Sequence, residues 1–205
     1  MFRERLATEF APFAVLSSDQ LDRLEEHYSL LAHWNQKLNL TRIRDLEEAV
    51  RFNYCESLFL GQVLPPGPLR IVDVGSGAGF PGIPLAILRP ECSIDLVESH
   101  HRKAVFLREA SRQLPNVNVI SARAESLTCA WDWAISRAVR SEDVIKLRLS
   151  CRFAVLMTQS ELSGLPEPIY IVPSPWGSDR IAALFHVKQR RSTRDLCSTR
   201  NDDRR

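Results

Sequence analysis

The amino-acid sequence predicts an α/β fold in which a mostly parallel sheet follows an N-terminal layer of helices. From residue 70 onward, short β-branched runs alternate with segments of helical spacing. This alternation is typical of parallel strands joined by crossover helices. A glycine-dense turn follows the first of these strands, whereas residues 1–60 contain only helical spacing. The chain is therefore expected to place its helical layer before a Rossmann-like core.

Two helices in the N-terminal layer are predicted from their capping residues. Ser17 and Gln20 form a capping box, and the apolar spacing after them predicts a helix over Ser18–Lys37. Asp45 and Glu48 have the same spacing ahead of a second apolar segment. We expect these helices to pack on the sheet.

A proline-rich run, Leu64–Pro68, separates the helices from the sheet, because it can be neither helix nor central strand. We expect residues 1–64 to form the helical extension, 65–190 the core, and 191–205 a disordered polar tail. The last strands are expected to form an antiparallel edge. Strands are predicted at 70–74, 93–98, 117–121, 131–136, 153–158, 169–172 and 183–188, and helices after Pro81, at 102–113 and at 141–149.

The composition is that of a globular protein. Of 205 residues, 44% are hydrophobic and 25% are charged, which excludes a disordered or fibrous chain. The five cysteines form no CxxC pair and the histidines show no metal-ligand spacing, so we expect reduced thiols and no metal. The charged N-terminus is unlike a signal peptide, and no run is long enough to span a membrane. We expect a cytoplasmic monomer.

The glycine-dense turn predicts a binding site for a small molecule. Gly75, Gly77 and Gly79 follow a buried strand, and glycine allows positive φ and close approach of backbone N–H groups to a ligand. The spacing is G-x-G-x-G, and Phe80 stands where the dinucleotide fingerprint has its third glycine. With Asp73 ahead of the glycines, the turn fits the D-x-G-x-G-x-G motif of S-adenosylmethionine-dependent methyltransferases better. The alternative is a turn that binds nothing.

Glu98 supplies a second indication of an adenosine cofactor. It ends the second predicted strand, about twenty residues beyond the glycines, where an acid can accept both ribose hydroxyls. The alternative is a solvated acid at a strand end.

The segment after the third strand is expected at the same sheet edge. Backbone groups at Ala124 and Glu125 could bind the edge of the adenine. A surface ion pair between Arg123 and Glu125 is the alternative.

Arg137 closes the fourth strand, at the edge that would face the methyl acceptor. Its guanidinium can neutralise a phosphate or a cofactor carboxylate, or donate to guanine O6 and N7. We favour this role over a structural salt bridge.

One stretch of the helical layer has the composition of an RNA-contacting surface. Residues 34–42 combine an aromatic side chain, amides, a hydroxyl and cations. The alternative is that Trp34 and Leu38 belong to the core and that the asparagines cap helix ends.

Taken together, these residues resemble the small-subunit ribosomal RNA methyltransferase G family, also called the glucose-inhibited division protein B family. The resemblance runs from about Leu21 to Lys188, and its most specific parts are Trp34-Asn35, Asn39-Leu40-Thr41, Asp73 to Ile87, Arg102 to Leu107, and Ile135 to Ala138. It implies a class I methyltransferase fold with an N-terminal helical extension. It also implies methylation of N7 of one guanosine in small-subunit (16S) ribosomal RNA, with S-adenosylmethionine as cofactor and the ribosomal RNA or the small subunit as partner. The cofactor contacts expected from motif and resemblance are Gly75, Gly77, Phe80, Glu98, Ala124, Glu125 and Arg137.

The chain departs from the family pattern at a few positions. The second N-terminal helix has Phe52-Asn53 and Glu56-Ser57 where the family usually shows an Arg-His or basic-aromatic pair followed by Asp-Ser. After the fifth strand, Met157-Thr158 replaces a common Lys-Gly pair. These departures concern RNA contacts more than the cofactor site.

Three other functions are compatible with parts of the sequence. A small-molecule methyltransferase would keep the cofactor site and need a closed apolar pocket. A noncatalytic RNA- or nucleotide-binding module would keep only the fold. An NAD-dependent oxidoreductase is disfavoured by Phe80.

Overall fold

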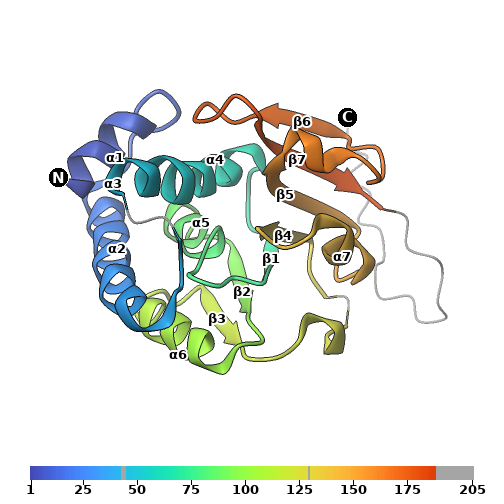
Figure 1. Cartoon of the computed structure of the whole chain (residues 1–205), viewed down its shortest axis with the longest axis horizontal. Helices are drawn as coiled ribbons and strands as arrows, with labels where there is room; N and C mark the ends of the chain where they lie inside the picture. The colour runs from blue at the N-terminus through green and yellow to red at the C-terminus, as the bar shows by residue number, and fades with distance from the viewer. Residues whose placement is uncertain (43–44, 129, 188–205) are drawn as a thin grey trace.

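The computed structural model describes residues 1–42, 45–128 and 130–187 as an α/β domain (Figure 1). The predicted tail at 191–205 and the predicted strand end at Lys188 lie outside the described residues. Within the described chain, no helix is long and apolar enough to cross a membrane.

The sheet has seven strands in the order β3-β2-β1-β4-β5-β7-β6. Strands β1 to β5 are parallel, and β7 and β6 add an antiparallel edge, so the predicted topology is confirmed. The strand order reverses between β1 and β4, and ligands of open α/β sheets bind outside the carboxyl ends of the strands at such a point. The strands are β1 (Arg70–Val74), β2 (Ser93–Val97), β3 (Val117–Ile120), β4 (Trp133–Arg137), β5 (Arg152–Thr158), β6 (Tyr170–Pro173) and β7 (Arg180–His186).

Helices cover the two sheet faces unequally (Figure 1). Alternate strand residues point to opposite faces, so Ile71 and Val72 belong to different apolar clusters. The Ile71 face is covered by most of the helices and the Val72 face by α7. The helices are α1 (Phe2–Phe10), α2 (Ser18–Leu38), α3 (Leu46–Glu48), α4 (Glu56–Val63), α5 (Gly82–Leu88), α6 (His101–Ala110) and α7 (Ser141–Lys146), with 3-10 turns η2 (Ala124–Ser126) and η3 (Gln159–Leu162).

The predicted α2 and its capping box are confirmed: the Gln20 N–H donates to Ser17 Oγ at 3.2 Å, and the Ser17 N–H donates to Gln20 Oε1 at 2.9 Å. The Asp45 cap is also confirmed, through Oδ1 and the N–H groups of Glu47 and Glu48. The sequence analysis did not predict α1.

The second N-terminal helix contains a π-helical segment, η1 (Ala49–Cys55), that the sequence analysis missed. The Glu56 N–H donates to the carbonyl of Arg51, five residues back, and the Ser57 hydroxyl donates to the carbonyl of Asn53. The six residues from Asn53 to Leu58 are all buried. A helix that is buried all round must be surrounded by other elements, and here η1 packs against α1 while α4 packs against α5.

Several predicted boundaries differ from the structure. The helix predicted over 141–149 ends at Lys146, because Arg148 has a positive φ of 53° that no α-helix accommodates. Strand β4 begins at Trp133 rather than residue 131, and Trp131 instead donates from Nε1 to Asp95 Oδ2 at 2.6 Å. Strand β7 begins at Arg180 rather than residue 183, because it pairs along the whole of β5.

A buried ion pair joins the N-terminal helices to the antiparallel edge. Glu56 is 1% exposed, and both of its carboxylate oxygens accept hydrogen bonds from Arg180, with Nη2 to Oε2 at 2.6 Å. Ser174 Oγ donates to the same carboxylate at 3.1 Å. The pair therefore holds α4 against β7.

Arg180→Leu is expected to destabilise the protein by about 3–5 kcal/mol, because it leaves the buried Glu56 carboxylate without its cation. Urea unfolding of this variant and of the double variant Glu56→Leu/Arg180→Leu measures the effect. The double variant should recover most of the loss. An equal loss of unfolding free energy in both variants would contradict the role of Arg180 in compensating the buried Glu56 carboxylate.

Candidate functional site

The main candidate site is a cavity of about 560 Å³ at the carboxyl ends of β1, β2 and β3. This volume lies within the range of small-ligand pockets. Three of the predicted site residues line the cavity: Gly75, Ala124 and Glu125. Val139, from the loop after β4, lines it as well.

The glycine loop is held against β2 by its own backbone. The carbonyl of Val97 accepts hydrogen bonds from the N–H groups of Gly75 at 2.9 Å and Ser76 at 3.1 Å. Gly75 has a φ of 72°, and a Cβ built on it would lie 2.5 Å from Cγ2 of Val139. Glycine is thus required here both by the backbone conformation and by the close approach of Val139.

Glu98 lies beside the glycine loop, where its carboxylate organises backbone groups. It is 7% exposed, and it accepts hydrogen bonds from the N–H of Gly77 at 3.0 Å and from the N–H of His100 at 2.7 Å. A carboxylate has further lone pairs to offer. The role predicted for Glu98 toward ribose hydroxyls stays a prediction.

Asp73 secures the far end of the glycine loop. Its Oδ2 accepts a hydrogen bond from the N–H of Gly82 at 3.0 Å, and a Cβ on Gly82 would lie 2.7 Å from the same oxygen. Burial raises the pKa of Asp73 to about 7, against the opposing effect of the Gly82 N–H. Asp73 is fully buried and lines neither the main cavity nor the one beside it.

The segment after β3 lines one side of the main cavity. Ala124 and Glu125 open the 3-10 turn η2, and the first N–H groups of a helix have no partner within it. Both Arg123 and Glu125 are exposed and described, and no ion pair joins them. The alternative reading as a surface ion pair is therefore wrong.

Arg137 does not reach the main cavity and is instead tied to η1. Its guanidinium donates to the backbone carbonyl of Phe52 and to Oδ1 of Asn53, and its Cζ lies 5.3 Å from the centre of the Phe80 ring. Burial lowers the pKa of Arg137 to about 10. No salt bridge to Arg137 occurs among the described residues, so its ordered position comes from neutral acceptors and an aromatic face.

A second cavity, of about 420 Å³, lies over the ends of β4 and β5. Arg137 and Val139 line it, and Val139 therefore separates the two cavities. The other walls are largely apolar or uncharged, although Arg180 and Glu161 also take part, and they include the departures at Phe52 and Met157.

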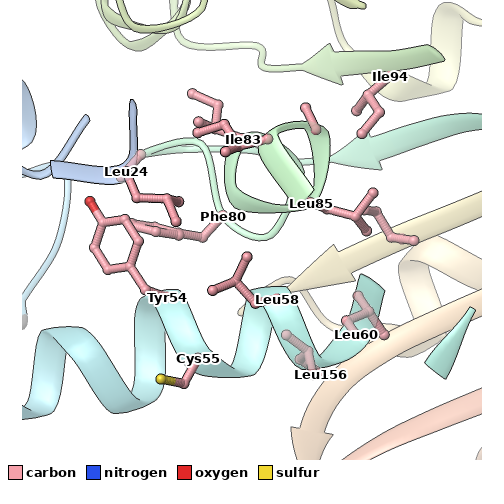
Figure 2. Packing of buried hydrophobic residues seen from close by; sticks show 14 of the residues in the cluster. Leu24, Tyr54, Cys55, Leu58, Leu60, Phe80, Ile83, Leu85, Ile94 and Leu156 are labelled. Carbon is pink, nitrogen blue, oxygen red and sulfur yellow. The ribbon is translucent and has the colours of Figure 1, made fainter. Parts of the chain in front are cut away.

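The Phe80 side chain is 5% exposed and points into the core rather than into the main cavity. Figure 2 shows it beside Tyr54 and beneath Leu24. The Tyr54 and Phe80 rings meet edge to face, with centroids 5.0 Å apart. A cofactor contact by Phe80 stays a prediction.

The sequence analysis missed His27, which joins α2 to the glycine loop. Its Nε2 lies 3.0 Å from the carbonyl oxygen of Ala78, and its Nδ1 lies 2.8 Å from the Tyr54 hydroxyl. Burial lowers the pKa of His27 to about 4, so the ring is neutral at pH 7. Its burial could have been predicted from the sequence, because His27 occupies the apolar stripe of α2 between Leu24 and Leu31.

The possible RNA-contacting stretch divides between core and surface. Trp34 packs against Phe106 with ring centroids 5.8 Å apart, and Asn35 bonds the backbone of Thr41 in both directions. Gln36 and Lys37 are exposed. The core role of Trp34 is confirmed, as is an asparagine cap, which is Asn39 at the end of α2 with a φ of 45°. RNA contact by the exposed side chains stays a prediction.

Cysteine and metal chemistry find no support in the described part of the chain. Cys55 and Cys92 are free and buried, and burial raises the pKa of both thiols. Within residues 1–42, 45–128 and 130–187, no three His, Cys, Asp or Glu side chains are grouped to hold a metal ion.

Comparison with known proteins connects this geometry to one family. The family described as rRNA small subunit methyltransferase G matches residues 20–151. A curated relative named ribosomal RNA small subunit methyltransferase G, from Chromobacterium violaceum, is 43% identical over 113 residues, 54% of each chain. One of the same name from Nitrosococcus oceani is 38% identical over 171 residues, 77% of this chain and 78% of the relative. The chain thus spans only about half the length of several curated relatives that it matches.

Solved structures support the fold. A protein from Aquifex aeolicus, described as a SAM dependent methyltransferase, superposes with a TM-score of 0.54 at 13% identity. The match covers 73% of this chain and 97% of that one. The predicted class I methyltransferase fold is confirmed.

Gly75→Ala is expected to destabilise the protein more than Gly67→Ala, by about 1–3 kcal/mol, because only residue 75 adds a clash to backbone strain. Gly67 is a matched control: its φ is 90°, and a Cβ on it would meet nothing within 4 Å. Urea unfolding of both variants gives the difference. Equal losses of unfolding free energy in the two variants would show that a Cβ at residue 75 does not clash with Val139.

Proposed function

The chain belongs to the rRNA small subunit methyltransferase G family, and we propose that it transfers a methyl group from S-adenosylmethionine to N7 of a guanosine in small-subunit ribosomal RNA. One observation carries the proposal beyond family membership: two adjacent cavities share the wall formed by Val139. Methyl transfer needs the donor and the acceptor to meet at such a boundary.

The main cavity, together with Gly77 and Glu98, which lie beside it in sequence and do not line it, fits the cofactor. The glycine loop leaves room for a ligand at Gly77, where a Cβ would meet nothing closer than the Gly75 carbonyl oxygen at 3.7 Å. Glu98 keeps lone pairs for ribose hydroxyls, and Ala124 and Glu125 line the cavity, where their backbone groups would bind an adenine edge. When bound, S-adenosylmethionine supplies an electrophilic methyl group on a positively charged sulfur.

The second cavity fits a flipped-out purine. Phe52 lines this cavity with the Arg180 guanidinium 5.4 Å from the centre of its ring, and aromatic side chains and arginine planes are what proteins use to stack an unpaired base. Arg137 uses two N–H groups on Phe52 and Asn53, and its remaining donors can reach guanine O6 or a phosphate.

The chemistry requires alignment rather than a base. Guanine N7 carries an in-plane lone pair and loses no proton when it is methylated, so the protein has only to position the acceptor and stabilise the shifting charge. The buried Asp73 is separated from both cavities and acts on the loop, not on the substrate. We assign positioning roles to Arg137 and Phe52 and no general base.

The apolar wall of the second cavity favours one alternative acceptor. Phe52, Leu156 and Met157 could enclose a small aromatic molecule in about 420 Å³. A small-molecule methyltransferase is therefore the second candidate. It would bind the same cofactor and leave RNA unmodified.

Incubation with labelled S-adenosylmethionine and small ribosomal subunits from a strain lacking the enzyme tests the proposal. Digestion and mass spectrometry of the nucleosides should reveal 7-methylguanosine at one position. Cofactor binding without transfer to subunits or to free ribosomal RNA would reject the RNA substrate and favour the small-molecule alternative. A protein that binds no cofactor would reject both.

A further inference from the structure

We propose that His27 and Tyr54, two side chains of the N-terminal helices, are positioning residues that set the affinity of the glycine loop for its cofactor. The proposal rests on the proposed function and assigns to the helical extension a part in the cofactor site. Neither residue lines the main cavity, so both act through the loop.

The hydrogen bonds form a continuous path from η1 to the loop. Tyr54 lies on η1, His27 on α2, and Ala78 in the glycine loop. Tyr54 is 0% exposed, His27 is 3% exposed, and the two hydrogen bonds measure 2.8 and 3.0 Å. A hydrogen bond in such a buried, low-dielectric setting is electrostatically stronger than one in water.

The path also fixes which nitrogen of His27 carries the proton. A carbonyl oxygen can only accept, so Nε2–H donates to Ala78 and the Nδ1 lone pair accepts from the Tyr54 hydroxyl. If Tyr54 lost its hydroxyl, Nδ1 would be a buried acceptor without a partner, and only the Ala78 carbonyl would still favour the Nε2–H tautomer. The other tautomer would set the Nε2 lone pair against the Ala78 carbonyl.

Glycine at position 79 allows His27 to come this close. A Cβ on Gly79, which has a φ of 88°, would lie 3.2 Å from Nε2 and 2.5 Å from Cδ1 of Ile83. The loop backbone therefore lies directly on the imidazole. The next residue, Phe80, continues the contact, with its ring centroid 5.2 Å from that of His27.

The same π-helical segment also holds the other side of the site. Phe52 and Asn53 bind Arg137 at the end of β4, while Tyr54 reaches the loop after β1 through His27. Three consecutive residues of η1 thus hold the end of β4 and the loop after β1, which belong to neighbouring strands of the sheet. A loop ordered in advance binds its ligand more tightly, because less ordering remains to be done on binding.

A purely structural role would be served better by apolar side chains. A buried imidazole and a buried phenol must be hydrogen-bonded, and an apolar pair of similar shape would carry no such requirement. The geometry points to a directed hydrogen bond that holds the Ala78 carbonyl in place, rather than to side chains that only fill space.

Four variants of the full chain test the proposal. His27→Leu removes both hydrogen bonds, Tyr54→Phe removes one oxygen atom, and His27→Gln keeps a donor near the position of Nε2. Phe185→Leu is the stability control, because Phe185 is fully buried in the other apolar cluster, near the opposite end of the sheet.

Two readouts are used, with and without cofactor. Calorimetry with S-adenosylmethionine should give a dissociation constant roughly tenfold higher for His27→Leu and Tyr54→Phe. His27→Gln should recover much of the affinity, and Phe185→Leu should keep it. Hydrogen exchange of the cofactor-free protein should be faster over residues 75–80 in the two weakened variants than in the control.

The outcomes separate this proposal from the proposed function. Unchanged affinity and unchanged loop exchange in Tyr54→Phe, which keeps the ring and its packing, would overturn it. If the wild-type protein bound no S-adenosylmethionine and the two weakened variants still exchanged faster over residues 75–80, the positioning role would be supported and the proposed cofactor rejected. An equal loss of affinity in Phe185→Leu would reduce the effect to general destabilisation and overturn the proposal.

Discussion

The structure of the site depends on the π-helical turn at Ala49–Cys55. Asn53 in this segment faces Arg137 and Tyr54 faces His27, so one short segment holds both the end of β4 and the glycine loop. π-Helical segments are rare and occur often at functional sites. In this protein the segment belongs to the N-terminal extension, which makes the helices part of the site rather than a separate cover.

Burial determines the electrostatics around the two cavities. Arg137 is held by neutral acceptors and an aromatic ring, and burial lowers its pKa to about 10. Glu56 is compensated by Arg180, whereas burial raises the pKa of Asp73 to about 7 against the lowering effects of the Gly82 N–H, Ser76 and Arg137. The charges near the site are therefore fixed in place before any ligand binds, which is the condition for electrostatic preorganisation.

Local patterns predicted most of the fold and part of the site. β-Branched runs, capping boxes and prolines act over a few residues. The mostly parallel sheet, α2 and the connector before β1 could therefore be predicted from them. The glycine motif led to Gly75, and the expected sheet edge after the third strand led to Ala124 and Glu125, which line the same cavity. What depends on distant contacts was not predicted: the π-helical turn, the inward direction of Phe80, and the pairing of His27 with Tyr54 across 27 positions.

The most direct test of the account is a titration of S-adenosylmethionine followed by backbone amide NMR. The account predicts that the largest shifts fall on Gly75, Gly77, Ala124 and Glu125, at the carboxyl ends of β1 to β3. The cavity between α2 and α6, which Arg23 and Glu109 line, should remain unaffected. Shifts confined to that cavity, or none at saturating cofactor, would contradict the placement of the cofactor site.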